Sequence, residues 1–152
     1  FGALTTAYQA CYASCMDQLY QDRILGFARA TRGMEPLDDH THEASVSNPT
    51  CGDRVDIRLK IENGTVIAAS AAIRGCALCE AGAGLLTQIA PQRQQQDLER
   101  IRDALAAWLA GADDADILEE MGAFAPVRDI KNRHKCVTLA FEASVKALSD
   151  KA

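Results

Sequence analysis

The chain has 152 residues, of which 48% are hydrophobic, and it carries a formal net charge of −5. This length suffices for a single domain with its own core, and the acidic balance, which no basic patch interrupts, argues against nucleic acid or an anionic membrane as a partner. No segment approaches the ~20 apolar residues of a membrane span, and residues 1–13 lack the basic start and the apolar run of a signal peptide. We therefore expect a cytoplasmic protein whose six cysteines stay reduced, as metal-binding or catalytic thiols rather than disulfides.

The first half of the chain predicts one helix followed by an antiparallel hairpin. Residues 4–30 have helical character, and a short strand is expected at 42–47. Residues 55–61 alternate between apolar and polar side chains, which is typical of a half-buried strand. Because Asn63-Gly64 is a strong signal for a tight hairpin, residues 66–73 are expected to be the return strand.

The second half of the chain predicts helices. We expect them at 77–90, 94–110, 116–121 and 132–149, and the second of these has a clear apolar stripe along one face. No internal repeat, low-complexity tract or interdomain linker interrupts the chain. A helix, then a small antiparallel sheet, then further helices is the order of an α+β domain, with the helices packed on one face of the sheet.

Three cysteines and one aspartate stand out by their positions. Cys51 and Asp53 lie on the turn before the hairpin. Cys76 lies where the return strand passes into a helix, and Cys136 lies near the start of the last helix. A loop and two helix starts can meet at one end of a small sheet, and a helix start lowers the pKa of a thiol. Three sulfurs and one carboxylate suit a tetrahedral zinc or iron ion.

The residues beside Cys136 add charge that suits such a site. Three thiolates and one carboxylate carry a formal charge of about −4, so a divalent ion leaves about −2. Arg133 and Lys135, which flank Cys136, would offset that remainder. The cysteines are not arranged in pairs at zinc-finger distances, however, so spacing alone leaves other interpretations open.

Two other functions and one structural explanation compete with a metal-dependent role. Cys76 and Cys79 form a CxxC at a strand-to-helix junction, which is typical of dithiol redox proteins. The hairpin before it is antiparallel rather than part of a βαβ unit, and a redox role leaves Cys51, Asp53 and Cys136 unused. A zinc-stabilised interaction domain would use the same ligands without chemistry. The cysteines could also serve as small buried hydrophobic residues.

Three sequence blocks resemble one known family. They are Asn48-Pro49-Thr50-Cys51-Gly52-Asp53, then Gly75-Cys76, then Arg133-His134-Lys135-Cys136. In this order they are similar to the IscU/SufU/NifU N-terminal family of iron–sulfur cluster assembly proteins, and the similarity runs from about Leu19 to Ala147. The resemblance implies a three-stranded antiparallel sheet with the site at one end, and it implies that the three cysteines and Asp53 are the ligands of a metal ion or cluster. It also implies a cysteine desulfurase of the SufS/IscS type as sulfur donor and apo iron–sulfur proteins as recipients.

Two details are closer to the SufU-like branch of that family. The separation of Cys76 from Cys136 leaves room for a helical insertion, which we assign to residues 94–115, and Lys135 stands where IscU-like members have a histidine. The resemblance thus favours a zinc-dependent sulfur acceptor over a stable scaffold. We expect one domain over residues 1–152, with 1–16 as an N-terminal extension.

The remaining expectations concern individual side chains. Cys79 replaces a small or hydroxyl residue of the family, and we expect it to pack beneath the site, with a spare ligand or a sulfur relay as the alternatives. Cys136, beside two cations, is the expected acceptor of persulfide sulfur. Asp53 is a harder and weaker ligand for a soft metal than a thiolate, so it is expected to keep the site labile.

Overall fold

The computed structural model describes residues 18–49 and 52–149 and has the predicted α+β architecture. A helix at residues 18–31, called here the N-terminal helix, comes first. It is followed in chain order by β1 (His42–Asn48), β2 (Asp53–Glu62), β3 (Thr65–Arg74), α2 (Ala77–Ile89), α3 (Gln95–Leu109), η1 (Glu119–Asp129), η2 (Lys131–Arg133) and α4 (His134–Ser149). Within the described residues, no helix combines the length and the apolarity that crossing a membrane requires.

The sheet is an antiparallel meander in the order β1-β2-β3, so β2 is central. The alternation that predicted β2 is real, since Val55, Ile57 and Leu59 are all fully buried while the residues between them face away from the core. Asn63 and Gly64 join β2 to β3 with φ values of 53° and 78°. Both central positions of a type I′ hairpin need positive φ, which Asn and Gly tolerate, so the predicted turn chemistry is confirmed.

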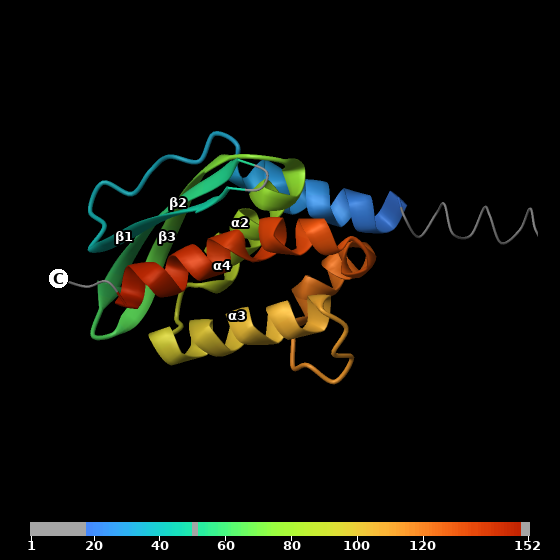
Figure 1. Cartoon of the computed structure of the whole chain (residues 1–152). Coiled ribbons are helices and arrows are strands. Elements are labelled where there is room, and N and C mark those ends of the chain that lie inside the picture. Colours follow the sequence, from blue (N-terminus) through green and yellow to red (C-terminus); the bar gives the residue numbers. More distant parts are fainter. Residues whose placement is uncertain (1–17, 50–51, 150–152) are drawn as a thin grey trace, which may run out of the picture.

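The helices cover one face of this sheet, as predicted. α4 packs against β1 and β2, α2 packs against β3, and α3 lies on α4 away from the sheet (Figure 1). The N-terminal helix approaches α2 closely, because a Cβ on Gly84 would overlap the backbone carbonyl of Phe27. The glycine therefore permits a backbone-to-backbone contact that a larger residue would block.

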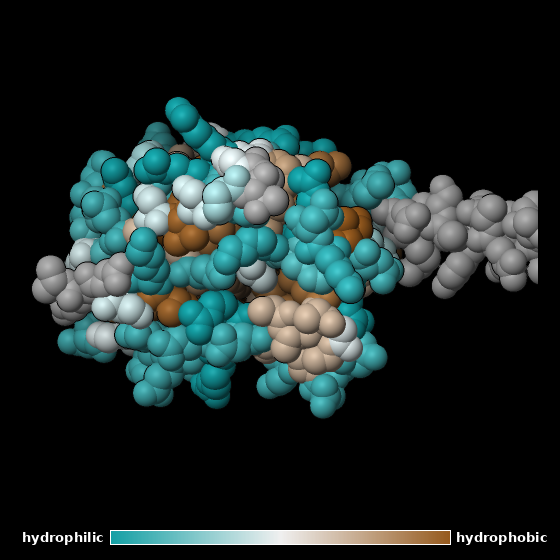
Figure 2. Space-filling model, viewed as in Figure 1, coloured by the Kyte–Doolittle hydropathy of each residue, from teal (hydrophilic) through white to brown (hydrophobic). Residues whose placement is uncertain are grey.

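The predicted apolar stripe of α3 is part of the core. Its buried members are Leu98, Ile101, Leu105, Trp108 and Leu109. The opposite side of the helix has exposed alanines in its second half, and they form the pale apolar patch low on the otherwise largely hydrophilic surface in Figure 2. α3 is thus amphipathic, and its apolar side binds it to α4.

The segment after α3 departs from the prediction. Instead of a helix at 116–121, the chain forms the 3₁₀-helical segment η1 at Glu119–Asp129. Its buried residues include Met121, Phe124 and Val127, which recur every three positions, the period of a 3₁₀-helix. Pro126 within this segment lacks the N–H that a regular α-helix needs there. The last helix also begins slightly later than predicted, at His134, because the short 3₁₀ turn η2 precedes it.

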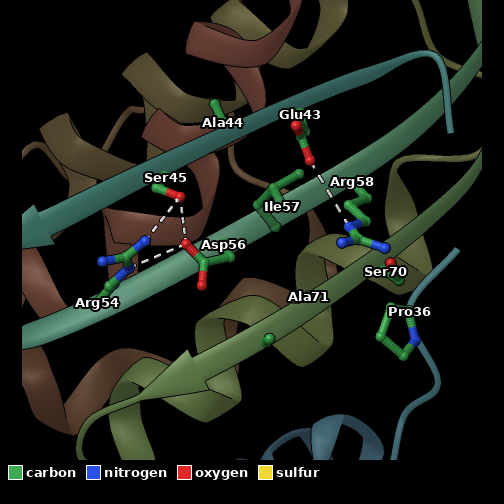
Figure 3. Close-up of a pocket in the computed structure, with 11 residues that line it drawn as sticks. Pro36, Glu43, Ala44, Ser45, Arg54, Asp56, Ile57, Arg58, Ser70 and Ala71 are labelled. Atoms are coloured by element: carbon green, nitrogen blue, oxygen red, sulfur yellow. Dashed lines mark hydrogen bonds and ion pairs between the residues drawn. The ribbon is translucent and has the colours of Figure 1, made fainter.

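The other face of the sheet is polar and holds a hollow of about 420 Å³ (Figure 3). Arg54 Nε lies 3.1 Å from Asp56 Oδ1, and Ser45 also donates a hydrogen bond to that carboxylate. Farther along, Glu43 forms an ion pair with Arg58 at 3.8 Å. No cysteine is among the residues that line this hollow, so it is separate from the thiol site described next.

Candidate metal centre

The meander brings the predicted site residues to one end of the sheet. β1 ends, β2 begins and β3 ends at this same end, because the three strands alternate in direction. Asp53 is the first residue of β2. Cys76 is the residue immediately before α2, and Cys136 is the third residue of α4. The predicted strand-to-helix position of Cys76 and the helix-start position of Cys136 are therefore confirmed.

Three of the four predicted ligands meet. Asp53 Oδ2 lies 3.1 Å from the sulfur of Cys136 and 3.9 Å from the sulfur of Cys76. One ligand atom from each residue lies within 4.8 Å of the other two. Asp53 is 4% exposed, Cys136 is fully buried, and Cys76 is half-buried at the surface of the cluster. The fourth predicted ligand, Cys51, lies outside the described residues.

Gly75 leaves the space that the carboxylate of Asp53 occupies. A Cβ at position 75 would lie 2.6 Å from Oδ1 and 2.8 Å from Cγ of Asp53. Any side chain there would therefore displace the carboxylate from the two thiols. Sequence reasoning noted Gly75 only as part of a motif, although a glycine directly before a candidate ligand was a signal of close approach.

Burial determines the protonation of Cys136. Its pKa is raised well above the usual range of a thiol, first by burial, then by its hydrogen bond to Asp53 and by the neighbouring Cys76. The expected lowering of the pKa by the helix start is thus outweighed at this position. In the metal-free protein the Cys136 thiol keeps its proton at neutral pH and donates it to Asp53 Oδ2.

Of the two cations predicted to offset the charge of the site, Arg133 reaches the thiols. A hydrogen bond from its guanidinium to Cys136, together with the charges of Cys76 and Cys136, raises the pKa of Arg133. The ammonium of Lys135 instead pairs with Glu142 at 2.7 Å. Glu142 was missed from the sequence, although it lies two helical turns from Lys135 on the same face of α4.

His134 has a structural contact rather than a place at the thiols. Its Nε2 lies 3.0 Å from the carbonyl oxygens of both Val127 and Arg128. This ring therefore ties the end of η1 to the start of α4, which helps to fix the direction in which α4 presents Cys136.

The donor set fits a thiophilic metal ion. Two sulfurs bound to one zinc ion at about 2.3 Å each lie at most about 4.6 Å apart, and a carboxylate oxygen binds at about 2.0–2.2 Å. The observed spacing within 4.8 Å is close to that limit before any ion is added. Two sulfurs and one carboxylate are ligands that zinc and iron both accept. The cluster can therefore hold such an ion once its thiols lose their protons.

Comparison with known proteins identifies the family of this chain. The sequence matches the family described as the NifU-like N terminal domain over residues 19–150, which is most of the chain. The chain belongs to this family. The match includes every element from β1 to α4 and the positions of Asp53, Cys76 and Cys136, so the family resemblance inferred from three short sequence blocks is confirmed.

Two curated relatives of this NifU-like domain have names that describe different roles. The iron–sulfur cluster assembly scaffold protein IscU of Thermotoga maritima is 28% identical, over 86% of this chain and 92% of the relative. The zinc-dependent sulfurtransferase SufU of Bacillus subtilis is 26% identical, over 88% of this chain and 92% of the relative. Relatives of both branches are thus found at similar identity.

Solved structures share the architecture. A NifU-like protein (N-terminal) from Brucella abortus superposes with a TM-score of 0.77 at 28% identity, covering 90% of this chain and 99% of that one. A putative iron–sulfur cluster assembly scaffold protein for the SUF system from Fervidobacterium islandicum has a TM-score of 0.76 at 17% identity, covering 83% and 93%. The predicted three-stranded sheet with helices on one face is the fold of these proteins.

Proposed function

We propose that this chain accepts persulfide sulfur from a cysteine desulfurase of the SufS/IscS type and holds a metal ion or a nascent iron–sulfur cluster on Cys51, Asp53, Cys76 and Cys136. Apo iron–sulfur proteins would receive the product. We favour a zinc-dependent sulfur acceptor over a stable scaffold, acting in the reducing cytoplasm, where thiolate ligands persist.

One observation carries the proposal, namely the meeting of Asp53, Cys76 and Cys136 within 4.8 Å at one end of the sheet. These residues come from three segments of the chain, and a packing role alone does not require a carboxyl group between two sulfurs. Cys51 completes the proposed set because only Gly52 separates it from Asp53 in the sequence.

The chain's own residues would prepare the thiols for sulfur transfer. When bound, a zinc ion would supply positive charge that keeps its ligand sulfurs as thiolates. Asp53 Oδ2 accepts a hydrogen bond from the Cys136 thiol at 3.1 Å, and Arg133 places a guanidinium beside Cys136 and Cys76. This cation would stabilise both a thiolate and the charge of an incoming persulfide.

Cys136 is the proposed sulfur acceptor, since its hydrogen bond with Arg133 is the largest cause of the raised pKa of that guanidinium, ahead of the smaller contribution of a hydrogen bond to Cys76. In the described state its sulfur is fully buried, whereas Cys76 is half-buried and borders the same cluster. Docking of the desulfurase would therefore have to expose Cys136, or sulfur would enter by way of Cys76. The thiolate of either residue would attack the outer sulfur of the donor's persulfide and become a persulfide itself, while the donor's cysteine leaves as a thiolate.

Asp53 has a second proposed role in the release of cargo. Its hydrogen bond and its charge both raise the pKa of Cys136 and so weaken that residue as a thiolate ligand. The Asp53→Ala variant should therefore hold its metal or cluster more persistently, with slower release to a competing chelator. The matched control is Asp56→Ala, which removes a carboxylate from the polar face of the sheet, away from the thiols. An unchanged release rate in Asp53→Ala would remove this role for Asp53.

Elemental analysis of anaerobically purified protein, paired with a desulfurase stimulation assay, tests the proposal. We expect bound zinc or iron and a faster turnover of the desulfurase when the chain is added. Cys76→Ser and Cys136→Ser should lose both effects. If the metal binds but the desulfurase is not stimulated, the chain is a zinc-stabilised interaction domain instead.

A further inference from the structure

Cys79 is the one described cysteine that the proposed function does not use. It lies three residues after Cys76, in the first turn of α2, and its side chain is fully buried in the core. This burial agrees with a packing role for Cys79. Its position one turn from Cys76 suggests a role in the chemistry of that thiol, and this role rests on the proposed function.

Cys76 and Cys79 occupy the N-cap position and the third helical position of α2. Cys76 has extended backbone angles of φ −75° and ψ 170°, and its carbonyl accepts the first bond of the helix from Glu80 at 3.1 Å. Side chains at these two positions lie on the same side of the first turn. In α3 the residues at the same two positions form a capping box, in which the side chain of Gln94 accepts a hydrogen bond from the backbone N–H of Asp97 and the side chain of Asp97 accepts one from the backbone N–H of Gln94.

This spacing brings the two thiols close to the separation that a disulfide needs. Helical residues three apart have Cβ atoms about 5–6 Å apart, and a disulfide needs about 3.5–4.5 Å. A small adjustment of the first turn, where Cys76 is not itself held in helical geometry, would close the difference. Cys76 is half-buried, whereas Cys79 is fully buried. An external sulfur donor would therefore meet Cys76 first, and Cys79 would be reached only through it.

We propose that Cys79 is a resolving thiol, which converts sulfur carried by Cys76 into free sulfide. Sulfur accepted at Cys136 can also reach Cys76, since the two sulfurs belong to one cluster within 4.8 Å. The conversion would need only residues of this chain, because a half-buried cysteine at the N-cap is paired with a buried cysteine in the first turn of the same helix.

The step balances as a thiol–disulfide exchange. The Cys79 thiolate attacks the inner sulfur of a Cys76 persulfide and forms the Cys76–Cys79 bond, while the bond to the outer sulfur breaks. The outer sulfur leaves as hydrosulfide with the electron pair. The sulfane sulfur is thereby reduced to the oxidation level of sulfide, and the two cysteines are oxidised to a disulfide. An external dithiol reductant would restore both thiols.

This chemistry meets a need of the proposed function. Persulfide delivers sulfur at a higher oxidation level than the sulfide of an iron–sulfur cluster, so two electrons must enter at some point. The Cys76–Cys79 pair would supply them within the chain. Forming the disulfide would also remove Cys76 from the set of metal ligands, so sulfide release and loosening of the site would occur together.

The test uses the full reduced chain and inorganic polysulfide as the sulfur donor, without a desulfurase. Trypsin cleaves after Arg74 and Arg93, so both thiols fall in one peptide, residues 75–93, that contains no other cysteine. After brief exposure to polysulfide, removal of the excess and acid quenching, mass spectrometry of this peptide distinguishes an internal disulfide, which is two hydrogens lighter, from a persulfide, which is one sulfur heavier.

We expect the wild-type peptide to be found mainly as the internal disulfide. The variants Cys79→Ala and Cys79→Ser should keep the extra sulfur on Cys76 and lose it at least about tenfold more slowly, because an intramolecular attack is replaced by slower external ones. Circular dichroism verifies that these variants fold. If they do not, the mass of the wild-type peptide alone decides between the internal disulfide and the persulfide.

Two outcomes would overturn the inference. One is a wild-type peptide that retains the Cys76 persulfide, and the other is a crosslink from Cys76 to Cys136 in place of Cys79. Neither outcome depends on a desulfurase, so neither touches the proposed function. Conversely, failure of the desulfurase stimulation assay would remove the proposed function while leaving the chemistry of Cys79 to be judged by the peptide masses.

Discussion

Replacing Gly75 with alanine tests the geometry of the site directly. The new Cβ would lie 2.6 Å from Asp53 Oδ1, whereas ordinary contacts begin at 3.4 Å, so the carboxylate must retreat by roughly 0.8 Å. Asp53 is 4% exposed and its other oxygen lies 3.1 Å from the Cys136 sulfur, so that retreat breaks the hydrogen bond. We expect the free energy of unfolding of the metal-free protein to fall by about 1–3 kcal/mol.

A double-mutant cycle isolates the cause of that loss. In an Asp53→Ala background the carboxylate is gone and only the Cβ of residue 53, at 3.1 Å, remains close to the new Cβ, so Gly75→Ala should cost much less than in wild type. Urea titrations followed by the fluorescence of Trp108, the only tryptophan, give the four free energies. Gly26→Ala is the matched control, because its Cβ would meet no atom within 4 Å. An equal cost of Gly75→Ala in both backgrounds would refute the assignment of that space to the carboxylate.

Three further predictions follow from the same structure. Because its folded pKa is raised above the unfolded value of about 8.5, Cys136 stabilises the metal-free fold below that pH and loses this contribution as the pH rises. From pH 7 to 10, urea titrations should show wild type losing about 2 kcal/mol more than Cys136→Ser; parallel curves would contradict this. Gly84→Ala should lower the free energy of unfolding by about 1–3 kcal/mol by separating α2 from the N-terminal helix, and a thermal melt no lower than that of Gly26→Ala would argue against this contact. Arg133→Gln should reduce desulfurase stimulation roughly tenfold, whereas Lys135→Gln, whose parent ammonium pairs with Glu142, should reduce it little; equal losses would mean that both cations serve the thiols.

Local sequence signals were enough to predict most of the fold. The alternation of β2, the Asn63-Gly64 turn and the apolar stripe of α3 each depend on neighbours within a few residues, and the structure has all three. The prediction of a helix at 116–121 is wrong, because the chain forms η1 over Glu119–Asp129 instead. The packing of η1 is governed by apolar residues at every third position and by Pro126.

The site could be predicted in its residue types but not in its electrostatics. Asp53, Cys76 and Cys136 meet as expected, because each stands at an end of an element that the meander brings together. The pairing of Lys135 with Glu142 and the raised pKa of Cys136 depend on which side chains the core surrounds. Burial of that kind is a property of the assembled tertiary structure, so no local pattern reports it.

The meeting of Asp53 with the two thiols and the raised pKa of Cys136 together affect how a metal ion would bind and leave. The hydrogen bond between Cys136 and Asp53 places a proton between the two ligand atoms that a metal ion would bind. Since metal binding requires the thiolate, loading the site must release that proton, and reprotonation favours unloading. Asp53 would therefore act on both sides of the proposed exchange, as a ligand for the ion and as the acceptor that stabilises the competing proton. A fourth thiolate in its place would bind more strongly as a ligand and lack this competition. A carboxylate is thus the side chain that suits a site which must give up what it holds.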